Sequence, residues 1–228
     1  MKIFERNIRG RRKGHKLSNR QLELVENLLP ALRIDPLEKS RLEPDKLFPI
    51  LTEDLWLEIG FGAGEHLIAQ SMKHTSIGFI GCEPFVNGVA KVLSAVEDNQ
   101  LKNIRIYDDD ARHVLSALPE ASIGRVFILF PDPWPKKRHH KRRFISTEVV
   151  DQLARITKPK AEVRIASDIG DYIKSTLLVF SNNQEFSWID LGPVDWRSRS
   201  PDWPETRYER KALSEGRQPV YLRFVRNI

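Results

Sequence analysis

The amino-acid sequence predicts an α/β protein built on a seven-stranded, mostly parallel sheet with helices on both faces and a terminal antiparallel pair. From residue 51 onward, five short apolar segments alternate with segments of helical periodicity, which is typical of a parallel sheet with crossover helices. The last two strand-like segments have no helical pattern between them, so we expect them to pair antiparallel.

The spacing of apolar residues predicts the approximate limits of each element. Strands are predicted at residues 55–59, 76–82, 103–107, 125–130, 162–167, 186–191 and 220–225. Helices are predicted at residues 65–73 and 85–98, shortly after 110, at about 144–157, and around Ile173, Leu177 and Phe180. The segment between 191 and 220 is rich in Pro, Trp and charged residues, which predicts a loop.

Residues 1–50 are predicted to precede the main domain, which is expected to span residues 51–228. We expect a mobile basic arm over residues 1–17, because residues 1–20 hold eight Lys or Arg and one acid. Ser18–Gln21 resembles a capping box, and the apolar stripe that follows predicts a short helix ending at Pro30. Four prolines between residues 30 and 50 predict an irregular linker.

Composition narrows the class of protein. The formal net charge of +6 is concentrated in two basic segments, residues 1–20 and 136–143, which favours a nucleic-acid partner. Cys82 is the single cysteine, and the six histidines show no metal-ligand spacing, so neither an intramolecular disulfide nor a metal site is expected. The longest wholly apolar run, Val126–Phe130, is too short to cross a bilayer. We therefore expect a cytoplasmic protein with no membrane contact and no obligate protein partner, either a monomer or a homodimer.

Candidate ligand-binding residues fall at the carboxyl ends of the predicted parallel strands, where open α/β sheets bind their ligands. The glycines of the Gly60–Gly64 loop let a ligand approach bare backbone at the start of a helix. Glu83 ends the second strand, where a carboxylate can accept both hydroxyls of a ribose. Any of the three acids in Asp108–Asp110 can serve as a further acceptor or cap the next helix.

The first loop is similar to motif I of class I S-adenosylmethionine-dependent methyltransferases. Its pattern is Glu58-x-Gly60-x-Gly62-x-Gly64, and Glu65 stands where a dinucleotide-binding fingerprint has its third glycine. The order of strands and helices resembles the Rossmann-like fold of the same class. This resemblance implies S-adenosylmethionine as cofactor and favours Asp110 as the acceptor for the adenine amino group.

The fourth strand runs into Phe130-Pro131-Asp132-Pro133-Trp134-Pro135, followed directly by the basic segment Lys136–Arg143. The prolines stiffen the turn, and a carboxylate beside an indole suits a flat polar ring. Trp134 either stacks on that ring or packs against Pro133 and the end of the sheet. The basic segment suits a polyanion.

This stretch closely resembles the signature of bacterial tRNA (guanine-N7-)-methyltransferases. Three further features agree with that family: Arg11-Arg12-Lys13-Gly14 before the first helix, Ser167-Asp168 after the fifth strand, and Thr206-Arg207-Tyr208-Glu209 before the last strand. The resemblance covers nearly the whole chain. It implies methyl transfer to N7 of a guanosine in the variable loop of tRNA, position 46 in tRNA numbering.

The same resemblance implies a role for each matching residue. The implied cofactor contacts are Glu58, Gly60, Gly62, Glu83, Asp110 and Asp132, of which Asp132 is also catalytic. The implied substrate contacts are Lys136, Asp168, Thr206, Arg207, Tyr208 and Glu209. The implied RNA contacts are Arg138, His139, His140, Lys141, Arg142 and Arg143. No metal belongs to this set, and tRNA is the expected partner.

Three other functions fit parts of the sequence. A nucleotide-dependent oxidoreductase would share the sheet, but Glu65 and the terminal antiparallel pair disfavour it. A methyltransferase acting on an exocyclic amine would use a similar turn, but the basic segment and Thr206–Glu209 favour the N7 reaction. A non-catalytic RNA-binding protein would have no use for acids at four strand ends.

Overall fold

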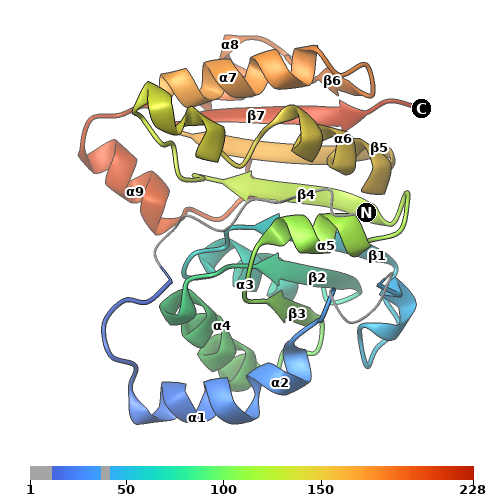
Figure 1. Cartoon of the computed structure of the whole chain (residues 1–228), viewed down its shortest axis with the longest axis vertical. Coiled ribbons are helices and arrows are strands. Elements are labelled where there is room, and N and C mark those ends of the chain that lie inside the picture. The colour runs from blue at the N-terminus through green and yellow to red at the C-terminus, as the bar shows by residue number, and fades with distance from the viewer. Residues whose placement is uncertain (1–11, 37–41) are drawn as a thin grey trace.

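A seven-stranded sheet forms the centre of the molecule in the computed structural model, which describes residues 12–36 and 42–228 (Figure 1). The strand order is β3-β2-β1-β4-β5-β7-β6. The strands are β1 (Asp54–Ile59), β2 (Ile77–Cys82), β3 (Ile104–Tyr107), β4 (Ile123–Leu129), β5 (Thr157–Ser167), β6 (Phe186–Trp188) and β7 (Val220–Arg226). Strands β1 to β5 pair in parallel, and β7 pairs antiparallel with both β5 and β6. The predicted fold class is confirmed.

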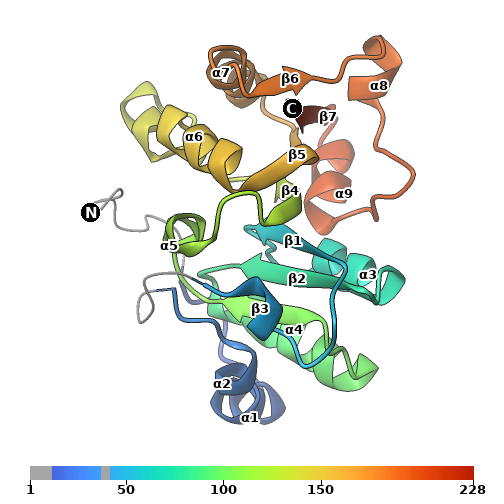
Figure 2. The same cartoon turned by 90° about the vertical axis from the view of Figure 1, so that its right-hand side faces the viewer.

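Helices cover both faces of the sheet (Figure 2). The helices are α1 (Asn19–Asn27), α2 (Leu29–Leu32), α3 (Glu65–Lys73), α4 (Val86–Asn99), α5 (Ala111–Ala117), α6 (Thr147–Ile156), α7 (Gly170–Ser181), α8 (Pro193–Arg197) and α9 (Arg207–Ser214). One core cluster joins the sheet to α5, α6 and α7, and a second joins it to α3 and α4, with α1 and α2 packed beyond. Strands that are buried on both faces explain why their sequences are almost continuously apolar.

The N-terminal segment packs on the main domain. The capping box predicted at Ser18 is present, because its hydroxyl accepts from the Gln21 backbone N–H while the Gln21 side chain accepts from the Ser18 N–H. Pro30 does not end the helical region as predicted, because it lies in the first turn of α2, where a missing N–H costs nothing. The predicted arm at 1–17 lies partly outside the described residues, and its part from residue 12 onward contacts α4: the Arg12 carbonyl accepts from the Val86 N–H at 3.0 Å.

The segment predicted as a loop between residues 191 and 220 contains two helices, α8 and α9, so that prediction is wrong. Helix α9 begins at Thr206, whose hydroxyl accepts from the Glu209 N–H at 3.2 Å as an N-cap. The helix was not predicted because its exposed face is charged and few of its residues are apolar. A further short turn of 3₁₀ helix, η1 (Pro44–Lys46), lies in the predicted linker, and the basic segment forms another, η2 (Lys137–Arg142).

We predict that Leu57→Ala in the centre of β1 lowers the free energy of unfolding by about 2–5 kcal/mol, because it leaves a cavity in the core. The Leu57 side chain has no exposed surface, whereas Leu178 on α7 is 56% exposed. Leu178→Ala is the matched control and should change the free energy of unfolding by no more than about 0.5 kcal/mol. Equal losses in urea titrations of the two variants would contradict the packing described above.

Candidate active site

The loop after β1 turns sharply over the carboxyl edge of the sheet. Gly60, Gly62 and Gly64 have φ values of +74°, +58° and +82°, in the left-handed region that favours glycine. At Gly60 an added Cβ would meet no atom within 4 Å, so the backbone faces open space there. A ligand can therefore reach this backbone, as the sequence predicted.

The carboxylate of Glu83 holds this loop in place. Its Oε2 accepts from the Gly62 N–H at 2.7 Å, and its Oε1 accepts from the Phe85 N–H at 3.0 Å. The side chain is buried, and this desolvation raises the pKa of Glu83, with a smaller contribution from the negative charge of Asp132. Each carboxylate oxygen keeps a lone pair beyond these bonds, so Glu83 can still accept from a ligand.

The loop also rests against the first turn of α4. A Cβ added at Gly88 would lie 1.9 Å from the carbonyl oxygen of Gly62, which is backbone and cannot swing away. Glycine at position 88 therefore permits the loop to approach α4 closely enough for Glu83 to bond to it. No sequence pattern indicated this role for Gly88.

Glu58 is paired with a histidine that sequence reasoning did not single out. Its Oε2 lies 2.7 Å from Nδ1 of His66 on α3, and both side chains are buried. The His66 ring packs edge-on against Phe127 and Trp203. His66 therefore orients the Glu58 carboxylate beneath the glycine loop. The spacing of eight residues between strand and helix carries no recognisable sequence signal.

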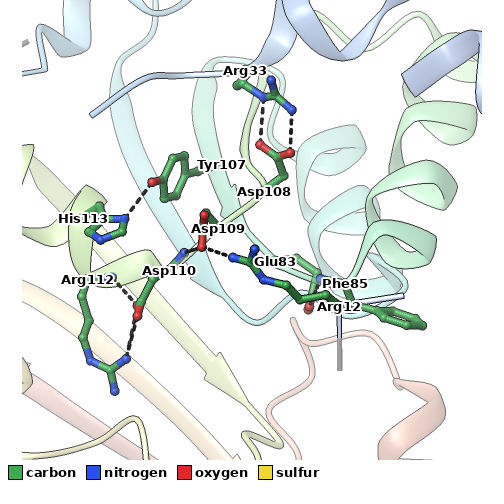
Figure 3. A network of polar contacts seen from close by, with 10 residues as sticks. All are labelled: Arg12, Arg33, Glu83, Phe85, Tyr107, Asp108, Asp109, Asp110, Arg112 and His113. Atoms are coloured by element: carbon green, nitrogen blue, oxygen red, sulfur yellow. Dashed lines mark hydrogen bonds and ion pairs between the residues drawn. The ribbon is translucent and has the colours of Figure 1, made fainter. Parts of the chain in front are cut away.

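The three aspartates after β3 have separate tasks (Figure 3). Asp108 pairs with Arg33 at 2.6 Å, and Asp109 pairs with Arg12 at 2.6 Å, so both bind the N-terminal segment. Asp110 is buried and caps α5, accepting from the Arg112 N–H at 3.0 Å and from its guanidinium. Asp110 is thus the one of the three aspartates whose side chain is buried, and its contact with the adenine amino group stays a prediction.

The acids after β2, β3 and β4 share electrostatic neighbours: Asp132 contributes to the raised pKa of Glu83, and both Glu83 and Asp110 act on Cys82. The pKa of the buried Cys82 thiol is raised chiefly by desolvation and also by the charges of Asp110 and Glu83. Asp132 is exposed to solvent, yet partial desolvation by the surrounding protein raises its pKa as well. The described residues contain no group of His, Cys, Asp or Glu suited to a metal ion.

The turn that carries Asp132 has an unusual backbone. Phe130 and Trp134 have φ values of +51° and +44°, which non-glycine residues seldom adopt. The Trp134 ring lies under the Arg142 guanidinium, 4.9 Å from its centroid, and edge-on to His139 at 5.9 Å. Trp134 therefore packs against the basic segment, a neighbour that neither interpretation of the sequence had proposed. Whether it also stacks on a base stays a prediction.

The predicted RNA contacts differ in exposure. Arg138 and Lys141 are exposed, as is the predicted substrate contact Lys136 at the start of η2. His140 is half-buried and lies 3.5 Å from Asp171. Arg143 is buried and bonds to protein groups.

Of the predicted substrate residues, Arg207 and Tyr208 on α9 lie beside the glycine loop. The Tyr208 ring covers Gly62, where an added Cβ would lie 2.9 Å from it, and the charge of Arg207 lowers the pKa of Glu83 slightly. Asp168 pairs with Arg217 at 2.5 Å. Glu209 is buried and accepts from the Tyr221 hydroxyl at 2.7 Å and from Arg199 at 2.8 Å. The carboxylates of Asp168 and Glu209 therefore have internal partners, and their roles as substrate contacts stay predictions.

The groups at the carboxyl edge of the sheet fit S-adenosylmethionine in their chemistry. Glu83 and Asp110 supply buried acceptors for hydroxyl and amino groups, and Gly60 leaves room for a ligand against the backbone. Glu58 and Asp132 supply negative charge for a cationic ligand.

None of the helices in the described part of the chain has the length and apolar character of a membrane span.

Solved structures with this architecture define the class. The 16S rRNA methyltransferase KamB superposes with a TM-score of 0.55 at 14% identity, over 78% of this chain and 89% of that one. The aminoglycoside resistance methyltransferase NpmB1 gives a TM-score of 0.53 at 13% identity, over 77% and 88%. The fold is that of class I S-adenosylmethionine-dependent methyltransferases.

Sequence comparison identifies the family. A family described as putative methyltransferases matches residues 52–222. The tRNA (guanine-N(7)-)-methyltransferase of Rhodospirillum rubrum is 48% identical over 221 residues, covering 95% of this chain and 86% of the relative. The enzyme of the same name from Chelativorans sp. is 46% identical over 217 residues, covering 95% and 94%. The chain belongs to the tRNA (guanine-N(7)-)-methyltransferase family.

We predict that Gly88→Ala weakens S-adenosylmethionine binding by about tenfold or more, which corresponds to ~1.4 kcal/mol. The added methyl group would displace the Gly62 carbonyl and with it the loop that Glu83 holds. Gly170→Ala is the matched control, because a Cβ at Gly170 meets no atom within 4 Å. Isothermal titration of both variants measures the difference, and wild-type affinity in Gly88→Ala would contradict the close approach.

We predict that S-adenosylmethionine affinity falls as the pH is lowered through the raised pKa of Glu83, and levels off above it. The fall should begin at a higher pH than an exposed glutamate would require, because burial raises this pKa. Glu83→Gln should bind weakly with a flatter pH dependence. Asp132→Asn should move the Glu83 transition to lower pH, because the Asp132 charge helps to raise that pKa. A transition that moves to higher pH in Asp132→Asn would refute the coupling.

Proposed function

We propose that this protein transfers the methyl group of S-adenosylmethionine to N7 of a guanosine in tRNA, and that the target lies in the variable loop at position 46 of tRNA numbering. The main support is the family membership established over 95% of the chain. The site supports it independently, because Asp132 lies electrostatically close to Glu83 and is followed at once by a basic helical turn. The same match favours methyl transfer over the oxidoreductase considered from the sequence.

The nucleophile needs little activation. Guanine N7 carries a free in-plane lone pair, so no proton has to leave before it attacks, and a general base is unnecessary. S-adenosylmethionine supplies an electrophilic methyl group on a sulfonium. The protein must therefore align N7 with that methyl group, and alignment alone can contribute on the order of 7 kcal/mol or more to the lowered barrier.

Asp132 is the residue we assign to this alignment. Its carboxylate accepts N–H donors of the guanine and compensates the positive charge that the ring gains as the methyl group arrives. Desolvation at Asp132, which raises its pKa, also strengthens its interaction with a nearby positive charge. Asp132 positions and compensates in this mechanism and does not deprotonate the nucleophile.

Recognition of guanine and of tRNA falls to the surrounding elements. Asp168, Thr206 and the α9 residues that follow form the guanine side of the pocket, where acceptors favour guanine because adenine has no N1–H or N2–H donors. The exposed cations of η2, Arg138 among them, hold the backbone phosphates. Access to a base within folded RNA requires the base to leave its stack.

A tRNA substrate and the buried, single Cys82 agree with a cytoplasmic location.

We predict that the protein transfers labelled methyl groups to unmodified tRNA and that borohydride–aniline treatment then cuts the product at one variable-loop guanosine. Asp132→Asn should lower kcat by about a hundred- to a thousand-fold, because it removes one preorganised charge. Asp45→Asn, which removes an exposed carboxylate in η1, is the control and should leave the rate unchanged.

The outcomes separate the alternatives. Label without cleavage would preserve the methyltransferase and overturn the N7 assignment. Cleavage at a guanosine outside the variable loop would overturn the position alone. No label, despite binding of both cofactor and tRNA, would favour the non-catalytic RNA-binding protein.

A further inference from the structure

We propose that Arg143 is a positioning residue that braces the Asp132 turn from within the protein, and that it is not one of the RNA contacts. The inference rests on the proposed function, because it assigns Arg143 a part in the same methyl transfer. The resemblance to the family had grouped Arg143 with the exposed cations of the basic segment. The contacts of its guanidinium separate it from them.

The first contact joins Arg143 directly to the catalytic turn. Its Nε donates to the carbonyl oxygen of Pro133 at 3.0 Å, and Pro133 follows Asp132 in the chain. The Arg143 side chain is only 5% exposed, so this hydrogen bond is shielded from water. A shift of Arg143 would therefore move the peptide unit adjacent to Asp132.

The remaining contacts anchor the guanidinium to α7 and η2. Nη1 donates to the Ser175 hydroxyl at 2.9 Å and to the Asp171 carbonyl at 3.3 Å. Nη2 bonds to the Asp171 carboxylate and lies 3.1 Å from Nε2 of His140. The face of the group lies 5.3 Å from the centroid of the buried Tyr172 ring. The hydrogen bond from Arg143 to the Asp171 carboxylate lowers the pKa of Asp171, as expected when a carboxylate lies beside a fixed cation.

Counting donors shows why no RNA contact is left to this side chain. A guanidinium has five N–H groups. In Arg143 four of these groups are engaged by the Pro133 and Asp171 carbonyls, the Ser175 hydroxyl and the Asp171 carboxylate, and Nη2 also lies 3.1 Å from Nε2 of His140, which accepts when the His140 ring is neutral with its proton on Nδ1. A phosphate could bind Arg143 only in competition with one of these protein groups. Arg138, by contrast, is exposed on η2.

The turn needs such a brace because its own backbone provides little support. Pro131, Pro133 and Pro135 have no N–H to donate. Phe130 and Trp134, on either side of Asp132, hold left-handed φ values that neighbouring structure must maintain. Arg143 supplies a donor from outside the turn, and its guanidinium group bonds to the Pro133 carbonyl and to Ser175 of α7 at the same time. A lysine carries its three donors on a single atom and cannot span both.

The test compares Arg143→Gln and Arg143→Lys with Arg138→Gln in the full chain. We expect both Arg143 variants to lower kcat for tRNA methylation by about tenfold or more, with tRNA Kd and its salt dependence as in the wild type. Arg138→Gln should instead weaken tRNA binding and reduce the salt slope by about one. Weakened binding and a reduced slope in Arg143→Gln, with an unchanged kcat at saturating tRNA, would overturn the proposal.

A double-mutant cycle distinguishes positioning from general destabilisation. If Arg143 acts through Asp132, then Arg143→Gln should cost much less in single-turnover rate when Asp132→Asn is already present. Equal losses in both backgrounds would overturn the proposal. If Arg143→Gln does not fold, Ser175→Ala provides a milder removal of one anchor and should lower kcat without changing tRNA Kd; an unchanged kcat would then count against the brace. Failure of the proposed function is separate, because it would show as absence of methyl transfer by the wild-type protein.

Discussion

The carboxylate of Glu83 is the group on which the organisation of the pocket depends. It joins the glycine loop after β1 to the segment between β2 and α4 through two backbone N–H groups. Gly88 makes the joint possible, because a side chain there would collide with the loop. The loop after β1 and the start of α4, about 20 residues apart in the sequence, therefore meet at one buried carboxylate. The ligand surface at the carboxyl edge of the sheet follows from that meeting, in agreement with the rule for open α/β sheets.

Burial of this carboxylate costs free energy, and the protein retains it because charge in a partly dry pocket interacts strongly. The raised pKa values of Glu83 and Asp132 are the visible sign of that cost. A sulfonium cofactor and a ring that becomes cationic are the kinds of ligand that negative groups in such a pocket favour. Geometry and electrostatics therefore support the same reaction that family membership indicates, and they do so without a general base.

Residues of one type that are consecutive in the sequence have different roles in the folded chain. Asp108 and Asp109 bind arginines of the N-terminal segment, whereas Asp110 caps α5 beside the pocket (Figure 3). In the basic segment, Arg138 faces solvent and Arg143 is buried against α7. A run of like charges is therefore not a uniform surface. Whether a residue of such a run is buried or exposed depends on whether the backbone turn directs its side chain toward the core.

The sequence by itself determined the order and type of most elements, because apolar periodicity and glycine or proline turns are local signals. It also placed Glu58, Glu83, Asp110 and Asp132 at strand ends, and the strand order confirmed that these ends share one edge. Helices α8 and α9 escaped prediction, since α8 is only five residues long and most residues of α9 are charged or polar. Only the tertiary structure decided which partners each polar group meets: His66 for Glu58, Arg217 for Asp168, and the Pro133 carbonyl for Arg143. Such pairings join residues that are apart in the chain, and they depend on how helices and loops pack on the sheet, which no local pattern encodes.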